Sequence, residues 1–211
     1  MYLPSHFSET RTEVLHNTLC QNPLGTLVAV VSGAATADEI PFVLAPERGT
    51  LGTLCGHVAR ANPLAHLPSG QHQALVIFRG PQAYVSPGWY PGKVEHGKVV
   101  PTWNYVTVQA RGQLRIIDQD PVWLREQLEA LTHFQEGQRA APWRVADAPP
   151  DYLAQMMRAI VGIEITLDTL LGKWKVSQNR SAADRAGLIQ GLSDEPGEQA
   201  TKMAQLLGQT L

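Results

Sequence analysis

Residues 51–63 read LGTLCGHVARANP, and the interpretation of the whole chain starts from this stretch. Its first part, residues 51–56, is short and mostly apolar, which predicts a β-strand. Its second part, residues 57–63, is a polar turn that holds His57, Arg60 and Asn62. An arginine can bind a phosphate through two parallel N–H bonds, and a turn adds backbone N–H donors. The stretch therefore predicts a strand that leads into a phosphate-binding turn, with a solvated polar turn as the alternative.

The rest of the chain alternates between strand and helix patterns. Apolar and β-branched runs predict strands over residues 26–32, 40–44, 74–78, 82–85, 102–117 and 161–167. Helices are expected over residues 9–21, 121–136 and 151–158, from Ser181 onward, and weakly over 196–207. Ser8, Asp120 and Ser181 are expected to cap three of them, with Pro121 in the first helical position. Gly80-Pro81 is expected to turn a hairpin, Gly112 to bend a strand, and residues 86–101 to form one long loop. With about six or seven strands and short connections, the pattern predicts an α+β fold in which peripheral helices surround an antiparallel barrel.

Composition excludes several classes of protein. The 211 residues are 44% hydrophobic and 17% charged, which is typical of a globular chain. A formal net charge of −2 argues against a generally basic nucleic-acid-binding protein. Two cysteines are too few for a disulfide scaffold or a four-cysteine zinc site, and they suit a reducing cytoplasm. No apolar run approaches the ~20 residues that span a bilayer, so we expect a cytoplasmic protein. The histidines lack the spacing of a zinc hydrolase, so we also expect no metal site.

Three further clusters combine aromatic, amide and cationic side chains. Residues 84–93 place two aromatics and a lysine in a loop rich in proline and glycine. Trp103 and Asn104 lie at the start of a predicted strand, where an amide could bind the edge of a heterocycle. Residues 172–180, GKWKVSQNR, are the most basic stretch of the chain. The aromatic rings of residues 84–93 could cover a planar ligand while Lys93 pairs with an anion, and the polar groups of residues 172–180 are typical of small-ligand sites. The alternatives are a loop anchored by a buried Trp89, core packing of Trp103, and a solvated face or a weak nucleic-acid patch at residues 172–180.

Taken together, the motifs resemble those of the PaiB-type family, described as FMN-binding negative transcriptional regulators. The resemblance extends from residue 1 to about residue 192, and Gly92 is a minor departure where a small polar residue is expected. The motifs that carry it are residues 1–7, 52–63, 86–90, 100–105 and 173–180. It implies the FMN-binding split β-barrel, which pyridoxamine-phosphate-oxidase-like proteins share and in which two chains pair around the flavin. The cofactor-binding residues that it implies are His57, Arg60, Asn62, Trp103, Asn104, Lys175, Gln178 and Arg180.

The resemblance also sets the expected organisation and function. Residues 1–180 are expected to form the split-barrel domain, and residues 181–211 a helical extension packed on it. We expect a homodimer that binds FMN and acts as a negative regulator, although the sequence itself does not support direct DNA binding. The alternatives are a flavin-dependent oxidoreductase, with His57, Tyr90 and Tyr105 as possible proton donors, and a haem-binding relative. Catalytic residues stay unassigned.

Overall fold

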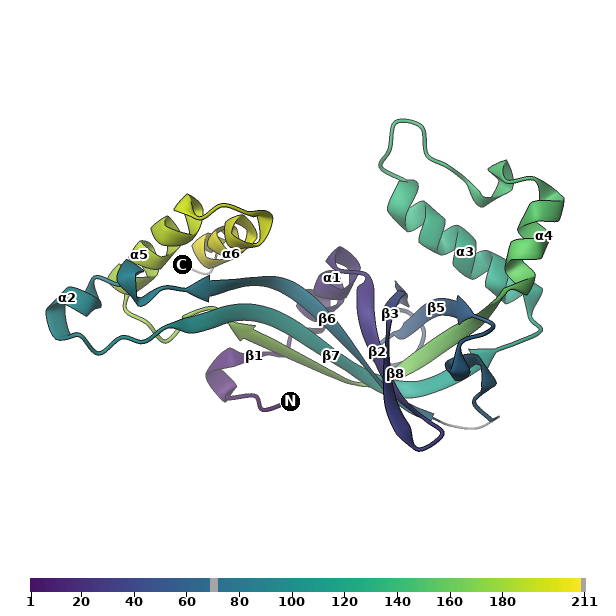
Figure 1. The fold of residues 1–211 in the computed structure, drawn as a ribbon, viewed down its shortest axis with the longest axis horizontal. Helices are drawn as coiled ribbons and strands as arrows, with labels where there is room; N and C mark the ends of the chain where they lie inside the picture. Colours follow the sequence, from purple (N-terminus) through teal and green to yellow (C-terminus); the bar gives the residue numbers. More distant parts are fainter. Residues whose placement is uncertain (69–71, 210–211) are drawn as a thin grey trace. The chain divides into compact units, whose positions relative to one another are not determined.

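The computed structural model describes residues 1–68 and 72–209, and it combines helices with one antiparallel sheet (Figure 1). The sheet order is β3-β2-β6-β7-β8-β5-β4, and β1 pairs with β8. The strands are β1 (Ser8–Glu9), β2 (Leu24–Val31), β3 (Ala34–Pro41), β4 (Val43–Ala45), β5 (Thr53–Ala59), β6 (His72–Val85), β7 (Thr102–Ile117) and β8 (Ile160–Lys175). The α-helices are α1 (Thr12–Gln21), α2 (Gly92–His96), α3 (Pro121–Glu136), α4 (Pro150–Arg158), α5 (Ala182–Asp194) and α6 (Glu198–Gln209). Short 3₁₀ helices are η1 (Ser5–Phe7), η2 (Pro63–His66), η3 (Pro87–Trp89) and η4 (Val145–Asp147).

The chain divides into two compact units, which are described separately. Unit 1 comprises Met1–Leu15, Arg79–Val108 and Leu171–Leu211, and unit 2 comprises His16–Phe78 and Gln109–Leu170. The long strands β6, β7 and β8 each contribute residues to both units. The predicted domain boundary at residue 180 stays a prediction.

Unit 2 is built on the hairpin of β2 and β3 and on the ladder of β4, β5 and the first part of β8. Ser32 and Gly33 connect the hairpin with φ angles of 52° and 82°, the left-handed geometry of a two-residue turn that matches strand twist. Leu27, Ile163 and Ile165 have no exposed surface, so alternate residues of β2 and β8 form the core of this unit.

Unit 1 has its own apolar core beneath α5 and α6. The two helices lie side by side in Figure 1, and their apolar side chains pack with residues of β6 and β7. Gly191 allows this packing because a Cβ atom there would come within 2.3 Å of the Trp89 ring. The buried members of the core are Ala83, Val85, Tyr90, Val106, Val176, Leu188, Leu192, Met203, Ala204 and Leu207.

The predicted hairpin at Gly80-Pro81 is wrong, because β6 continues through both residues. The pairing of β6 with β2 covers residues 75–77, so Pro81 lies beyond it, where a missing N–H breaks no bond to β2. Gly80 allows close approach of the next strand, since a Cβ atom there would lie 3.0 Å from Val106. A glycine-proline pair can therefore lie within a strand that packs closely against its neighbour, rather than in a turn.

Other boundaries also differ from the sequence prediction. Ser8 belongs to β1, and α1 begins at Thr12 rather than at residue 9. The loop expected over residues 86–101 contains η3 and α2, and β8 extends to Lys175, well beyond residue 167. Strand β5 extends to Ala59, so His57 lies on a strand rather than in the turn. For β1, β5 and β8, pairing with a partner distant in the sequence extends or replaces the local pattern.

The helix caps predicted at Asp120 and Ser181 are confirmed, whereas Ser8 lies in β1 and does not cap α1. Asp120 caps α3 by accepting a bond from the backbone N–H of Trp123 at 2.9 Å, and Pro121 takes the first helical position. Ser181 caps α5 in the same way through the N–H of Asp184, at 3.1 Å. Within the described residues, no helix is long and apolar enough to cross a membrane.

Candidate functional site

Arg60 lies directly after β5 in unit 2, and the protein holds its guanidinium at three points. Its Nη1 donates to Asp118 at 2.9 Å, its Nε to the carbonyl of Arg158 at 2.9 Å, and its Nη2 to the carbonyl of Ile160 at 3.2 Å. The backbone N–H of Arg60 donates to the carbonyl of Ala159 at 2.8 Å. The guanidinium lowers the pKa of the Asp118 carboxyl, chiefly by hydrogen bonding. Arg60 is therefore positioned before any ligand arrives, and Asp118 occupies part of its binding capacity.

A cavity of about 370 Å³ lies beside Arg60. Arg60 and Arg158 contribute its cationic side chains, while Asp118 and Asp120 contribute carboxylates. Asp120 is bound at the start of α3 and Asp118 is bound to Arg60. Gln119 adds a polar group, and apolar or small side chains complete the lining: Ile117, Pro121, Leu124, Ala154, Met157 and Ile160. An apolar wall with an arginine at its rim suits a ligand that has one apolar part and one anionic part.

His57 and Asn62, the other predicted residues of this unit, are bound inside the protein. The ring Nδ1 of His57 lies 2.9 Å from Oε1 of the buried Gln127. This hydrogen bond engages Nδ1, so Nε2 is the ring nitrogen that remains for another contact. Asn62 accepts a bond from the N–H of Leu64 at 2.9 Å and donates to Asp38 at 3.1 Å, so it caps η2.

The remaining predicted residues lie in unit 1, where the two amides have local partners. Asn104 is 1% exposed and exchanges hydrogen bonds of 3.0 and 3.1 Å with Ser177. Gln178 accepts from the N–H of Val176 and donates to the carbonyls of His6 and Trp174. These bonds fix the segment that follows β8, where Ser177 has a left-handed φ of 58°.

The two predicted cofactor-binding cations of unit 1, Lys175 and Arg180, are held by neutral groups. Lys175 donates to the hydroxyl of Thr102 and to the carbonyl of Trp103, both at 2.5 Å. Its pKa is lowered, first by burial and then by the positive charges of Lys173 and Arg180. Arg180 lies over the ring of Tyr90, 4.9 Å from its centroid. Trp103 is 48% exposed and meets Tyr84 edge to face, so one aromatic face of this unit is open to solvent.

A small cavity of about 80 Å³ collects several of these residues. Asn104, Lys175 and Arg180 all contribute to it. The other lining residues are Phe7, Thr102, Ser177 and Asn179. Of the eight predicted site residues, three therefore lie in unit 2 around β5 and five in unit 1 around β7 and the end of β8.

The possible proton donors differ in their surroundings. Tyr90 is 2% exposed inside the apolar core of unit 1, and its hydroxyl has no hydrogen-bond partner among the described residues. Tyr105 lies under Lys173, whose Nζ is 5.4 Å from the ring centroid. Core packing accounts for Tyr90 and a cation–π contact for Tyr105.

One ion cluster of unit 2 was missed by the sequence prediction. Glu164 alternates along β8 with the apolar Ile163 and Ile165, a pattern that predicts an exposed face for it, yet it is 5% exposed. Arg48 donates to one oxygen of its carboxylate at 2.7 Å, and Arg115 donates to the other at 2.5 and 2.8 Å. Burial alone would raise the pKa of Glu164, but the two guanidinium groups lower it below the ordinary value. The available signal was an acidic residue between two isoleucines, Ile163 and Ile165.

The chain matches a family of flavin-binding domains. A family model described as "Putative FMN-binding domain" matches residues 1–169. A Bacillus subtilis protein named Protease synthase and sporulation protein PAI 2 is 30% identical, covering 98% of this chain and 96% of its own length. The chain belongs to this FMN-binding domain family. The family confirms the sequence resemblance and FMN as the expected cofactor. An uncharacterized protein of Emericella nidulans is 38% identical over 92% of this chain and 91% of its own length.

Solved structures share the fold of this FMN-binding domain. An FAD and haem binding protein from Mycobacterium smegmatis has a TM-score of 0.60 at 20% identity, covering 85% of this chain and 78% of that chain. The flavocytochrome Anf3 from Azotobacter vinelandii has a TM-score of 0.62 at 12% identity, and the match covers 88% of this chain and 78% of that chain. At such identities the likeness concerns the fold, and it confirms the predicted α+β split barrel.

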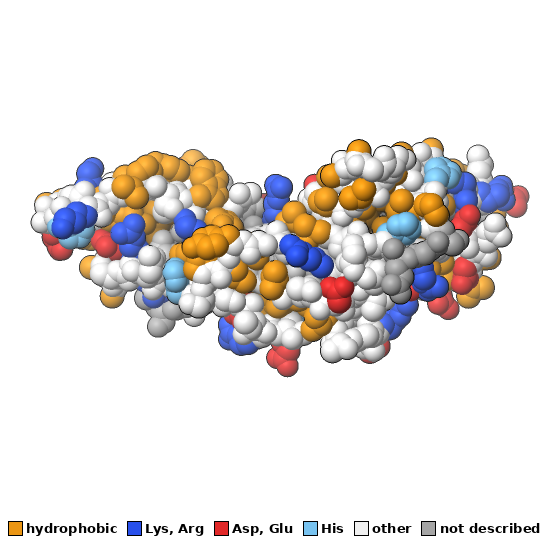
Figure 2. Space-filling model, turned by 90° about the horizontal axis from the view of Figure 1, so that it is seen from below, with side chains coloured by type: hydrophobic (Ala, Val, Ile, Leu, Met, Phe, Trp, Pro, Cys, Tyr) orange, Lys and Arg blue, Asp and Glu red, His pale blue; other side chains and the backbone are white. Residues whose placement is uncertain are grey.

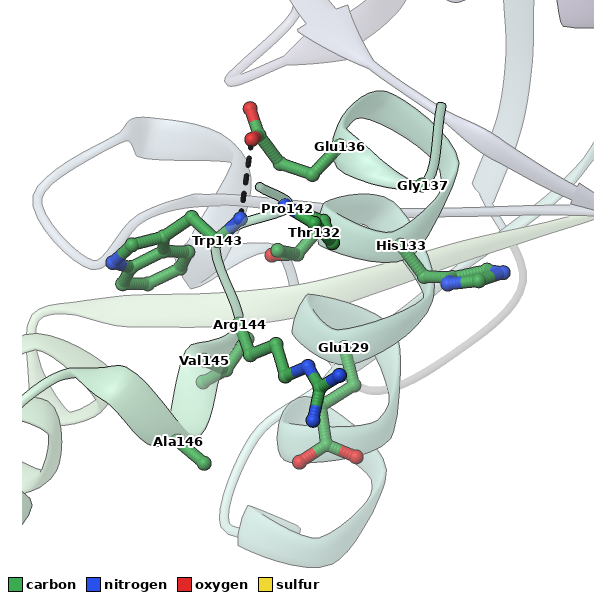
Figure 3. Close-up of a pocket in the computed structure, with 10 residues that line it drawn as sticks. All are labelled: Glu129, Thr132, His133, Glu136, Gly137, Pro142, Trp143, Arg144, Val145 and Ala146. Carbon is green, nitrogen blue, oxygen red and sulfur yellow. Dashed lines mark hydrogen bonds between the residues drawn. The ribbon is translucent and has the colours of Figure 1, made fainter. Parts of the chain in front are cut away.

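A further cavity of about 430 Å³ in unit 2 contains none of the predicted residues (Figure 3). It lies between the second half of α3 and residues 142–146, where the N–H of Trp143 donates to Glu136 at 3.3 Å. Its two carboxylates are already paired, Glu129 with Arg125 and Glu136 with Arg139. Arg144 also lines this cavity, but within the described residues its guanidinium is not fixed by three acceptors as that of Arg60 is.

Replacing Glu164 should destabilise the protein in a pH-dependent way. Glu164→Gln removes the acceptor of two guanidinium groups and should lower the free energy of unfolding at pH 7 by ~1.5–3 kcal/mol. Because the folded-state pKa of Glu164 is lowered, the stabilisation is present at pH values above the ordinary 4.5 and is lost as the pH falls through the folded-state pKa. Urea denaturation at pH 7 and near pH 3.5 measures both effects.

The matched control is Glu129→Gln, which breaks the exposed pair with Arg125. An exposed pair of this kind contributes about 0.3–0.5 kcal/mol, so the control should unfold almost as the native chain does. Equal unfolding free energies for Glu164→Gln and the native chain at pH 7 would show that the cluster has no stabilising role.

Proposed function

We propose that this chain is a cytoplasmic, homodimeric FMN-binding regulator of the PaiB type, with the FMN phosphate bound at Arg60. The observation that carries the residue assignment is the Arg60 guanidinium, fixed by three acceptors at the rim of an apolar-walled cavity. A phosphate with nearly two negative charges is bound best by a charged fork whose orientation is already set. The free thiols of Cys20 and Cys55 are in keeping with a reducing compartment.

The residues beside Arg60 fit the two parts of FMN. The isoalloxazine is planar and largely apolar, and the cavity wall offers Leu124, Met157 and Ile160. Asp118 and an incoming phosphate would compete for Arg60, so binding exchanges one anionic partner for a more highly charged one. His57 is bound to Gln127 through Nδ1, so its Nε2 is the ring nitrogen that a ligand could contact. When bound, FMN supplies electron and hydride transfer chemistry.

Arg60→Ala should weaken FMN far more than riboflavin, which lacks the phosphate. Loss of a charge-assisted contact costs ~1.5–3 kcal/mol, which corresponds to about a ten- to more than a hundredfold rise in the Kd for FMN. Asp118→Asn should have the opposite effect on FMN, because it removes the competing carboxylate. Calorimetric titration of each variant with FMN and with riboflavin measures the four Kd values.

The control for this experiment is Arg139→Ala, an exposed arginine of the same unit that pairs with Glu136. It should bind FMN as the native chain does. If Arg60→Ala binds FMN with native affinity, Arg60 is a structural turn residue and the assignment fails.

The proposed homodimer follows from the family resemblance and from the apolar surface. Among the described residues, Val94, Val122 and Val30 are 93%, 67% and 61% exposed. Apolar atoms also reach the surface in separate groups on the face shown in Figure 2. Obligate interfaces bury about 2,000 Å² or more, and such residues can supply part of that area.

Light scattering after gel filtration should give twice the chain mass of 23.1 kDa. The mass should stay at this value on dilution to low micromolar concentration, because a large interface dissociates only at lower concentrations. A particle of one chain mass at micromolar concentration would contradict the homodimer.

The regulatory role comes from the PaiB-type resemblance, and the relative named Protease synthase and sporulation protein supports it. We propose that any regulation occurs without sequence-specific DNA binding by the isolated protein. The net charge is −2, and the most basic stretch, residues 172–180, is short. Phosphate contacts from so few cations give weak binding that falls steeply with salt.

Gel-shift titration with the protein's own promoter region at about 150 mM salt tests this prediction. We expect no discrete complex at low micromolar protein. A nanomolar complex that survives increasing salt and prefers the promoter over random DNA would overturn it.

A further inference from the structure

We propose that the cavity of about 80 Å³ in unit 1 binds the phosphate or carboxylate group of a second small molecule, distinct from FMN. Lys175 and Arg180 would supply the charge, and Thr102 and Asn179 would supply polar contacts. This oxyanion site extends the proposed function, because it gives the flavoprotein a place for the anionic group of a substrate or effector.

The first support is the charge balance of the cavity. Lys173, Lys175 and Arg180 form no ion pair with a carboxylate within residues 1–68 and 72–209. Two carboxylates of the same unit are used elsewhere, since Glu9 pairs with Arg11 and Asp184 accepts from the N–H of Gly92. Cations gathered without a counter-ion repel one another, and an oxyanion between them relieves that repulsion.

The second support is the way in which the cations are held. Lys173 is 8% exposed and is bound by the carbonyl of Tyr2 at 3.1 Å. Lys175 is bound by a hydroxyl and a carbonyl, and Arg180 by an aromatic face. All these partners are neutral, so they orient the cations and leave the positive charge uncompensated. A buried salt bridge, in contrast, would leave little charge for a ligand.

The third support is the rigid floor of the cavity. Asn104 and Ser177 both line it, are at least nine-tenths buried and bind each other in both directions. Gln178 ties the following segment to the carbonyls of His6 and Trp174. A site that is ordered before binding loses little conformational entropy when the ligand arrives.

Size decides which chemical group fits. A water molecule takes up about 30 Å³ of liquid, so 80 Å³ accepts one phosphate or carboxylate group and not a flavin ring. The rest of the ligand would extend outside the cavity. Arg180 can bind two oxygens of such a group at once, whereas Lys175 contributes a point charge.

The test uses inorganic phosphate and, in a second arm, acetate as probes. Each is titrated calorimetrically into native protein at low ionic strength, once without flavin and once saturated with FMN. We expect at least one probe to bind with similar affinity in both states. Lys175→Met and Arg180→Gln should each raise the Kd for that probe about tenfold or more.

The control variant is Lys202→Met, which removes a cation of the same unit that pairs with Glu198 on the surface of α6. It should bind the probe as the native chain does. Arg180→Lys keeps the charge and should recover part of the affinity lost in Arg180→Gln. Thermal unfolding of each variant shows whether a loss of probe binding is due to a loss of the folded structure. If Arg180→Gln fails to fold, Arg180→Lys, which should unfold as the native chain does, still tests the contribution of the guanidinium to probe binding.

Three results would overturn the second-ligand site. The first is that neither probe binds to the native chain. The second is that Lys175→Met and Arg180→Gln bind the probe as well as Lys202→Met does. Alternatively, saturation with FMN abolishes probe binding and Lys175→Met weakens FMN but not riboflavin, which would assign the cavity to the FMN phosphate itself. Failure of FMN to bind at all would contradict the proposed function instead, and the flavin-free titration would still decide the oxyanion site.

Discussion

Strand β8 carries charged side chains within the sheet, in both units. The way in which each charge is compensated decides whether the residue stabilises the fold or is available to a ligand. Glu164 is compensated within the protein by Arg48 and Arg115, which makes it a structural ion cluster. Lys173 and Lys175 are held by carbonyls, a hydroxyl and aromatic rings, so their charge is oriented but not cancelled. Because burying an uncompensated charge is costly, its persistence in a folded site points to a ligand of opposite sign.

The same reasoning separates the two groups of predicted cofactor residues. Arg60 already has an anionic partner in Asp118, so a phosphate there has to displace a carboxylate. The cations of the small cavity have no such partner among the described residues, so an oxyanion there displaces no carboxylate. Arg60 therefore suits a dianion that outcompetes Asp118, while the small cavity suits a weaker or more transient anion. The sites differ in the ligand charge that they require.

Local chemistry is what the sequence predicts best. Asp120-Pro121 and Ser181 cap their helices as expected, because a cap depends on residues within one helical turn. Gly80-Pro81 misleads, because its role depends on where the pairing with β2 ends and on Val106 in another strand. The type of fold followed from the number of strands and the short connections between them. Strand lengths did not, since β8 is extended by neighbours distant in the sequence.

The site follows the same division between local and distant contacts. The motif of residues 51–63 identified Arg60 from its own sequence, but Asp118 and Gln127, which bind Arg60 and His57, lie far along the chain. Nothing in the local pattern of either partner signals the contact. Asn62 and Gln178 were chosen for their hydrogen-bonding chemistry, and that chemistry is used within the fold. A polar residue in a motif therefore indicates a ligand contact only when the fold leaves its charge or its donors unsatisfied.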